Sequence, residues 1–198
     1  MKDWKGNSKS TFVTLGATNH SEKERADLDF YATHPDVVED LLKVEDFSHR
    51  IWEPACGQLH ISKVLEAHGH EVRSSDIVRR CDGAEEKDFL LFNTDTFDGD
   101  IITNPPYAKA EDFVLQSLQC VTEGHKVAML LRLLFLEGQG RKSRLYDVAP
   151  PHTVYVFSKR AKCAINGDFG ATKGGSAQAY GWFVWTKGYK GETKIKWI

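Results

Sequence analysis

Apolar residues along the chain follow two different spacings. In residues 34–44, 61–70 and 111–121 they recur every three to four positions, which predicts amphipathic helices, with Pro35 near the start of the first. Short apolar runs bounded by turn residues predict strands at 49–53, 71–77, 99–103, 126–136, 152–158 and 179–188. Strands that alternate with helices indicate an α/β fold, a mainly parallel sheet with right-handed crossovers.

Small or acidic residues follow four of the apolar segments, in the turns Glu53–Gly57, Asp76, Asp88–Phe89 and Asn104–Tyr107. Ligands of open parallel sheets bind beyond the carboxyl ends of the strands, so we expect these four turns to share one rim. The first turn contains small residues that let a ligand approach the backbone, and an acidic residue after the second strand can accept hydrogen bonds from ribose hydroxyls. Neither feature is specific alone, since the first turn is neither GxGxxG nor a P-loop.

The fourth turn carries two consecutive prolines. Pro105 and Pro106 fix φ and remove two backbone donors, and Pro105 favours an extended Asn104. The Asn104 side-chain carbonyl and a proline carbonyl then offer two acceptors for the hydrogens of one NH2 group. Such bonds favour attack by the amine nitrogen on an in-line electrophile, and Tyr107 offers an aromatic face for a planar base. The turn therefore suits the presentation of an exocyclic amine for transfer chemistry.

Five segments, in this order, resemble motifs of S-adenosylmethionine-dependent N6-adenine DNA methyltransferases of the phage and prophage type. They are "DFYATHP" at 29–35, "EPACG" at 53–57, "SSDI" at 74–77, "DFL" at 88–90 and "NPPY" at 104–107. The likeness covers roughly residues 14–190, including the opening "LGATNHSEKERADLDFYAT". Many relatives continue the cofactor turn as Gly-x-Gly, whereas this chain has Leu59 after Gln58.

The resemblance implies a Rossmann-like class I methyltransferase fold, with a mainly parallel seven-stranded sheet, an antiparallel late strand and helices on both faces. It also implies methyl transfer from S-adenosylmethionine to the N6 amine of adenine in DNA, and a phage or prophage origin. The catalytic residues would be Asn104, Pro105, Pro106 and Tyr107. S-adenosylmethionine would be bound by Tyr31, Thr33, Glu53, Ala55, Gly57, Asp76, Asp88, Phe89 and Asn104.

Length and composition favour one globular domain. Of the 198 residues 41% are hydrophobic, and we expect a polar, mobile arm over 1–28 before a single domain over 29–198. No apolar run approaches the ~18 residues of a membrane span and the start lacks a signal-peptide segment, which favours a bacterial cytoplasm. The four cysteines form no CxxC pair, so we expect reduced thiols and no metal site.

Charge is distributed unevenly. Residues 1–140 hold 15 Lys and Arg against 25 Asp and Glu, whereas residues 141–198 hold 11 against 3. This basic third is either a solvated surface or a surface for DNA phosphates. It includes two Gly-rich polar segments, at 137–144 and 160–178, and we find no large target-recognition domain, so we expect a short or loose sequence preference. The candidate phosphate contacts are Arg141, Lys142, Arg144, Lys159, Arg160 and Lys162.

Three alternatives stay open. The same turn serves enzymes that methylate a glutamine amide in release factors, although those carry an N-terminal helical domain and a more Gly-rich cofactor turn. RNA adenine is a further substrate, because no residue pattern here distinguishes a 2′-hydroxyl. A third alternative is a catalytically silent nucleic-acid-binding relative. We expect a monomer or weak dimer.

Overall fold

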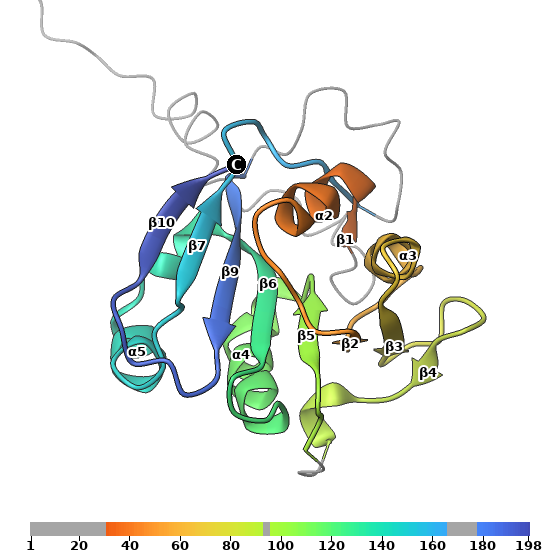
Figure 1. Cartoon of the computed structure of the whole chain (residues 1–198), viewed down its shortest axis with the longest axis horizontal. Helices are drawn as coiled ribbons and strands as arrows, with labels where there is room; N and C mark the ends of the chain where they lie inside the picture. The colour runs from red at the N-terminus through yellow and green to blue at the C-terminus, as the bar shows by residue number, and fades with distance from the viewer. Residues whose placement is uncertain (1–30, 93–95, 166–177) are drawn as a thin grey trace, which may run out of the picture.

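The computed structural model describes residues 31–92, 96–165 and 178–198, so the predicted arm over 1–28 lies outside the described residues. Eight strands form one sheet in the order β10-β7-β9-β6-β5-β2-β3-β4 (Figure 1). In addition, β1 pairs antiparallel with β8 in a separate two-stranded sheet. The strands are β1 Tyr31–Thr33, β2 Arg50–Glu53, β3 Glu71–Asp76, β4 Glu85–Glu86, β5 Asp100–Thr103, β6 Lys126–Arg132, β7 Thr153–Val156, β8 Cys163–Ile165, β9 Tyr180–Thr186 and β10 Lys194–Trp197.

The main sheet is parallel except for β9, which runs antiparallel to both of its neighbours, β6 and β7. The predicted antiparallel late strand is therefore confirmed, but the sheet has eight strands and not seven. The sequence pattern missed two strands of this sheet, the two-residue β4 and the edge strand β10, which pairs parallel with β7. Its residues alternate Lys, Ile, Lys and Trp and all four are exposed, so it lacks the apolar run of a buried strand.

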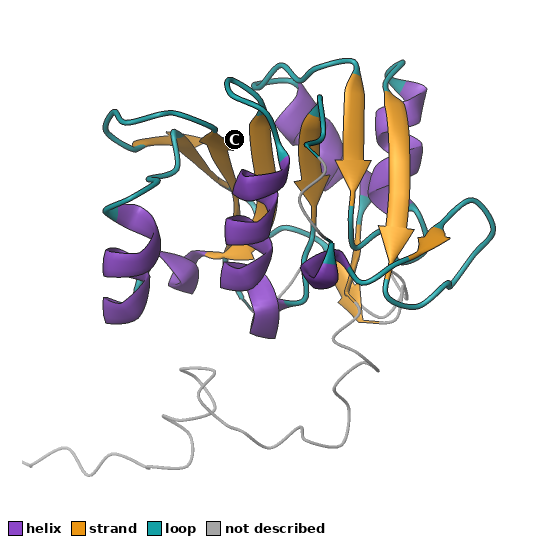
Figure 2. Cartoon of the chain, turned by 90° about the horizontal axis from the view of Figure 1, so that it is seen from below, coloured by secondary structure: helices purple, strands orange, loops and turns teal. Residues whose placement is uncertain are grey.

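Helices cover both faces of the sheet, as predicted (Figure 2). They are α2 Pro35–Leu42, α3 His60–Ala67, α4 Ala110–Cys120 and α5 Gln139–Arg141, with short 3-10 segments η2 Phe89–Leu91, η3 Tyr107–Lys109 and η4 Leu133–Leu136 and a π-helical turn η5 Lys142–Tyr146. The predicted strand over 126–136 ends at Arg132, because its last residues form η4. The chain thus leaves the sheet one turn earlier than the apolar run suggests.

Two apolar clusters hold the helices to the sheet. On one face α4 packs through Phe113 and Val114 against Trp52 and Met129 of the sheet. On the other face α2 and α3 pack against the opposite side of the same strands. Burial of this apolar surface is the main favourable term in folding, at roughly 25 cal/mol per Å². It places the amino ends of α3 and α4 next to the turns that follow β2 and β5.

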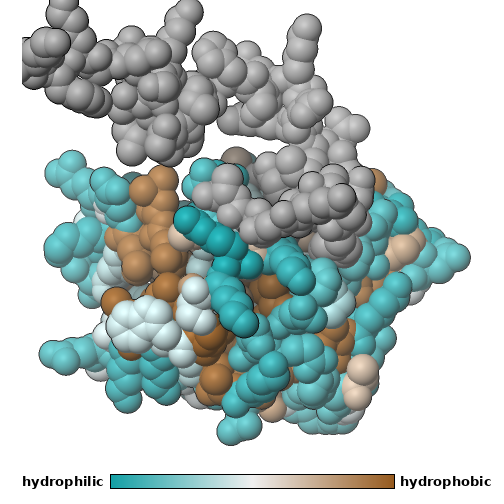
Figure 3. Space-filling view, turned by 90° about the horizontal axis from the view of Figure 1, so that it is seen from above, coloured by the Kyte–Doolittle hydropathy of each residue, from teal (hydrophilic) through white to brown (hydrophobic). Residues whose placement is uncertain are grey.

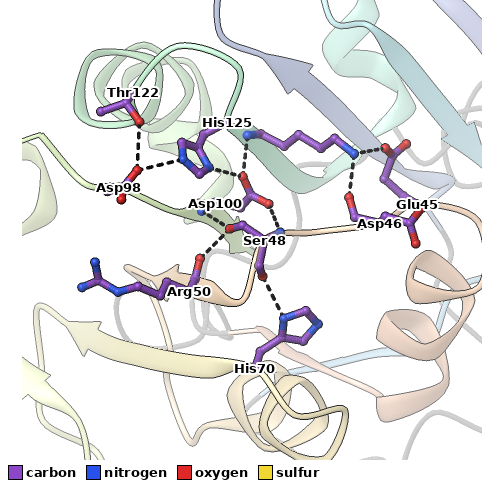
Figure 4. Close-up of polar contacts among 10 residues, drawn as sticks. Glu45, Asp46, Ser48, Arg50, His70, Asp98, Asp100, Thr122 and His125 are labelled. Atoms are coloured by element: carbon purple, nitrogen blue, oxygen red, sulfur yellow. Dashed lines mark hydrogen bonds and ion pairs between the residues drawn. The ribbon is translucent and has the colours of Figure 1, made fainter.

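A buried carboxylate joins three segments at the end of the sheet where β5 and β6 begin. Asp100 accepts hydrogen bonds from the backbone N–H of Ser48 (2.6 Å) and of Lys126 (2.7 Å) and lies 3.0 Å from Nδ1 of His125 (Figure 4). The second ring nitrogen of His125 lies 3.1 Å from the exposed Asp98. This network ties the loop before β2 to the starts of β5 and β6, and it lies at the opposite end of the strands from the predicted rim.

Candidate functional site

A cavity of about 530 Å³ lies at the carboxyl ends of β2, β3 and β5. Figure 3 views the molecule from this end. The cavity brings together turns from four separate parts of the chain, which confirms that they share one rim. Its lining includes seven of the predicted cofactor-binding residues and one of the prolines: Thr33, Glu53, Ala55, Asp76, Asp88, Phe89, Asn104 and Pro106.

Glu53 ends β2 and is buried at the base of the cavity. Its Oε2 accepts hydrogen bonds from the backbone N–H (2.8 Å) and the hydroxyl of Ser62 in α3. Burial raises the pKa of Glu53 to about 8, an effect that the Ser62 hydrogen bonds only partly offset and that the negative charge of Asp76 reinforces. A cationic ligand beside Glu53 would therefore favour the ionised form of its carboxyl group.

Asp76 ends β3 and is fixed by two backbone donors. Its Oδ2 accepts from the N–H of Gly57 (2.8 Å) and its Oδ1 from the N–H of Val78 (3.0 Å). Gly57 is thus a support for Asp76 and not itself a cavity-lining residue. Each carboxylate oxygen has capacity for a further hydrogen bond, so Asp76 can still accept from hydroxyl groups in the cavity.

Asp88 begins the short segment η2. One of its carboxylate oxygens accepts from the N–H of Leu90 (3.0 Å), and its side chain lines the cavity. The next residue, Phe89, is buried and packs edge-on against Trp52, with 5.1 Å between the ring centroids. These contacts give this part of the cavity an apolar wall beside one acidic group, which suits a planar heterocycle with an amine.

Asn104 lies directly after β5, and its amide is oriented by a residue far away in the sequence. Nδ2 of Asn104 donates to Oγ1 of Thr33 (3.1 Å), and Thr33 is buried at the end of β1. The sequence analysis placed Thr33 among the cofactor-binding residues and did not anticipate that it orients the Asn104 amide. The side chain of Tyr31, at the start of β1, lies outside the described part of the structure, but its backbone pairs with Ile165 of β8.

The two proline carbonyls differ in the turn after Asn104. The Pro106 carbonyl accepts from the N–H of Lys109 (2.8 Å), whereas within the described residues no hydrogen bond uses the Pro105 carbonyl. Pro105 does not itself line the cavity, but Pro106 does. Of the two proline carbonyls, that of Pro105 is therefore the one without a hydrogen bond from another described residue.

Tyr107 does not line the cavity in this structure. Its ring lies 5.6 Å from that of Tyr180, and the guanidinium of Arg132 lies 4.7 Å from its centroid. Arg132, at the end of β6, is a residue that the sequence analysis did not name. A base that stacks on Tyr107 would have to use ring surface that Arg132 leaves open, so the stacking role stays a prediction.

Leu59 precedes α3 and adopts φ 64° and ψ 30°, the left-handed region that favours glycine. It is the one non-glycine residue with positive φ in the described part of the chain. Gly57, two residues earlier, also has positive φ, at 51°. The turn thus keeps the backbone path of a Gly-x-Gly sequence although the second glycine is replaced by leucine.

The cavity has further lining residues outside the predicted set. Ile77 directly follows Asp76 and is 54% exposed, so it offers an apolar surface at the mouth of the cavity. The pKa of His60 is lowered by burial and by the positive charge of Lys63. Most of these residues adjoin a motif position, which is the signal that could have found them. The other lining residues are Ala32, Pro54, Cys56, Ile61, Arg80, Leu90, Ala108, Lys109 and Phe113.

Several of the basic residues predicted to contact phosphates form hydrogen bonds or ion pairs within the protein. Arg141 donates to two backbone carbonyls of the preceding segment. Arg144 pairs with Glu111 of α4 (2.7 Å), and Lys142 pairs with Asp147 (2.8 Å). The charges of Arg144 and Lys142 are thus partly neutralised, which reduces what each can contribute to binding a polyanion.

The loop after β7 carries the remaining three. Lys162 lies 3.7 Å from Asp36, so it is also paired. Lys159 and Arg160 are both exposed, and neither forms an ion pair with any other described residue. Of the six predicted residues, these two are the best placed to contact phosphates.

Within the described residues, no group of three or more His, Cys, Asp and Glu side chains is arranged to hold a metal ion. Likewise, none of the helices in the described ranges combines the length and the hydropathy needed to cross a bilayer.

Comparison with known proteins gives matches only at the level of structure. No family model and no curated protein sequence matches the chain. A class I S-adenosylmethionine-dependent methyltransferase structure from Listeria monocytogenes superimposes with a TM-score of 0.53, at 12% identity, over 83% of this chain and 62% of that one. TrmN from Thermus thermophilus gives 0.54, at 18% identity, over 77% of this chain and 48% of that one.

The chain has the class I methyltransferase fold. The type IIG restriction endonuclease BpuSI contains the same fold, with a TM-score of 0.52 at 13% identity over 80% of this chain and 25% of that one. This chain covers less than two thirds of the length of each of the first two proteins. Within the class I methyltransferase fold the cavity lies at the rim where ligands of parallel α/β sheets bind.

Proposed function

We propose that this protein transfers a methyl group from S-adenosylmethionine to the N6 amine of adenine in DNA. The observation that carries the proposal is that one cavity is lined both by the acidic turns after β2 and β3 and by Asn104 and Pro106 after β5. The proposed site for the nucleoside cofactor and the proposed site for the amine would therefore adjoin each other. The similar Listeria protein is described as dependent on S-adenosylmethionine, which supports the same cofactor here.

The residues that line the cavity fit S-adenosylmethionine by their chemistry. Asp76 can accept from the ribose hydroxyls, and Asp88 can accept from the adenine amine beside the apolar wall formed by Phe89. Glu53 suits the cationic methionine end, because a nearby positive charge favours the ionised form of a carboxyl group whose pKa burial has raised. When bound, the cofactor would supply an electrophilic methyl group on a sulfonium.

The turn after β5 would hold the acceptor amine. Asn104 Oδ1 and the Pro105 carbonyl each accept one amine hydrogen, and Pro106 keeps the turn rigid. The N6 amine of a paired adenine lies on its Watson–Crick edge, so the base must leave the duplex stack at a cost of a few kcal/mol. No general base is required, because the methylated amine can release its proton to solvent.

The deciding experiment is incubation of the protein with labelled S-adenosylmethionine and DNA, RNA or a cell protein extract, followed by mass analysis of the nucleosides and of the peptides. Label in N6-methyladenine of DNA is the expected result. Label confined to N6-methyladenine of RNA, to a protein glutamine or to cytosine would each replace the proposed substrate with another. Single-stranded and mismatched DNA should be accepted at least as readily as duplex, because they avoid the cost of extrusion.

Two substitutions separate catalysis from cofactor binding. Asn104→Ala should abolish turnover while binding S-adenosylmethionine nearly as tightly as the wild type in calorimetry. Asp76→Ala should weaken that binding, because it removes the proposed acceptor of the ribose hydroxyls. If neither variant nor wild type binds S-adenosylmethionine, the alternative of a catalytically silent nucleic-acid-binding protein is favoured.

A further inference from the structure

The edge strand β10 exposes two large apolar side chains. Trp197 is 71% exposed and Ile195 is 53% exposed. By contrast, the other tryptophans within the described residues, Trp52, Trp182 and Trp185, are buried in the core. Adjacent exposed apolar side chains rimmed by polar residues are typical of interaction surfaces.

The register of β10 separates its apolar and basic side chains. Trp197 pairs with Val156 and Ile195 with Val154, and both valines belong to the face of the sheet that α4 covers. Lys194 and Lys196 therefore lie on the opposite face, where the Lys196 ammonium lies 5.6 Å from the ring centroid of Tyr155. The strand thus presents an aromatic group on one side and positive charge on the other.

Further positive charge follows at the end of the strand. The N–H of Ser158 donates to the carbonyl of Ile198 (2.7 Å), so Lys159 and Arg160 come directly after the point where β7 and β10 end. From there the loop runs toward the cavity, because the Lys162 carbonyl accepts from the N–H of His34 (3.1 Å). His34 is the neighbour of the cavity residue Thr33. In the view of Figure 3, hydrophobic side chains (brown) and side chains of intermediate hydropathy (pale) lie beside hydrophilic ones (teal) on the side of the molecule where β7 and β10 lie.

We propose that Trp197, together with Lys159 and Arg160, binds a single-stranded segment of nucleic acid at the edge of the sheet, which β7, β9 and β6 separate from the reaction site after β5. One unstacked base stacks on the indole ring, and the basic side chains contact the flanking phosphates. Base–aromatic stacking tolerates any base because each has a π-face, so such a surface increases affinity without demanding a sequence. The inference rests on the proposed function, since it names how the strand that carries the target base is held.

Charge favours this occupant over a second copy of the chain. Pairing two β10 edges would bring Lys194 and Lys196 of each copy close to those of the other, and lysine on an edge strand opposes such pairing. A polyanion would instead be attracted to this region, because residues 141–198 hold 11 Lys and Arg against 3 Asp and Glu. Neither Lys159 nor Arg160 pairs with an acidic group among the described residues, so binding requires no ion pair there to break.

The test compares two labelled strands of equal length and charge, roughly 12 nucleotides long, one normal and one in which every base is absent. Fluorescence anisotropy would measure the affinity of each for the full chain. Trp197→Ala should weaken binding of the normal strand at least fivefold and leave the abasic strand unaffected, since only stacking is lost. Trp197→Phe should retain most of the affinity, and Leu91→Ala, which removes an exposed apolar side chain elsewhere, should bind like the wild type.

Wild-type affinity of Trp197→Ala for the normal strand, or equal loss on both strands, would overturn the stacking surface. So would sedimentation showing a dimer that only Trp197→Ala dissociates, which would assign the surface to a second copy. The same strands made of RNA distinguish which nucleic acid is preferred. If Trp197→Ala loses base-dependent binding but the wild type forms no N6-methyladenine, the stacking surface stands and the proposed reaction fails. If the wild type forms N6-methyladenine but Trp197→Ala binds both strands like the wild type, only the stacking surface is rejected.

Discussion

At the scale of single residues, Glu53 makes stability depend on pH. Its pKa is about 8 in the folded protein, chiefly because of burial, against an ordinary value of 4.5. The folded state thus favours the protonated form, so its contribution to the free energy of unfolding is full below pH 4.5 and is lost as pH rises toward 8. Denaturant unfolding between these pH values should lose on the order of a few kcal/mol from this group.

Glu53→Gln should flatten this dependence, because the amide oxygen can still accept from Ser62 without titrating. The matched control is Glu86→Gln, since Glu86 is exposed at the edge of the sheet and should leave the pH profile unchanged. An equally steep profile in Glu53→Gln would show that other groups cause it.

A second prediction at this scale concerns the hydrogen bond from Asn104 to Thr33. Thr33→Val keeps the shape of the side chain but removes the acceptor that orients the amide, so turnover should fall roughly fivefold to tenfold. Thr33→Ser should restore it. Calorimetry decides between positioning and cofactor contact, because loss of S-adenosylmethionine affinity in Thr33→Val without loss of turnover at saturation would reject the positioning role.

At the scale of elements, Asp100 is what holds the starts of β5 and β6 to the loop before β2. It is buried and accepts from two backbone donors, so Asp100→Ala leaves those donors unsatisfied. The free energy of unfolding should fall by about 2–4 kcal/mol. Asp98→Ala removes only exposed contacts, those with His125 and Thr122, and should cost less than about 1 kcal/mol. Similar losses in chemical denaturation of both variants would contradict this division.

At the scale of the whole molecule, the basic third should act through charges that the fold leaves unpaired. Lys159→Ala and Arg160→Ala should each weaken DNA binding on every sequence and flatten the dependence of log affinity on log salt by roughly one unit. Lys142→Ala should change the slope less, because Lys142 already pairs with Asp147. Anisotropy titrations at several salt concentrations would measure these slopes, and an affinity independent of salt would remove the basic surface from the proposal.

The sequence alone determined the order of the main elements and the shared rim of Asp76, Asp88 and Asn104. It could do so because apolar spacing is a local property and parallel strands place their carboxyl ends together. Its apolar pattern missed two strands of the sheet, because β4 has only two residues and the exposed β10 lacks a continuous apolar run. It also named the positive charges of the basic third without indicating which of them are paired.

Tertiary structure alone decided the contacts between distant segments. Thr33 orients an amide 71 residues away, and Arg132 covers part of the Tyr107 ring. The same applies to Trp197, which remains exposed because no described element packs over the outer side of β10. Such contacts depend on how packed layers bring side chains together across the sheet, and no periodicity along one segment encodes the partner that lies opposite.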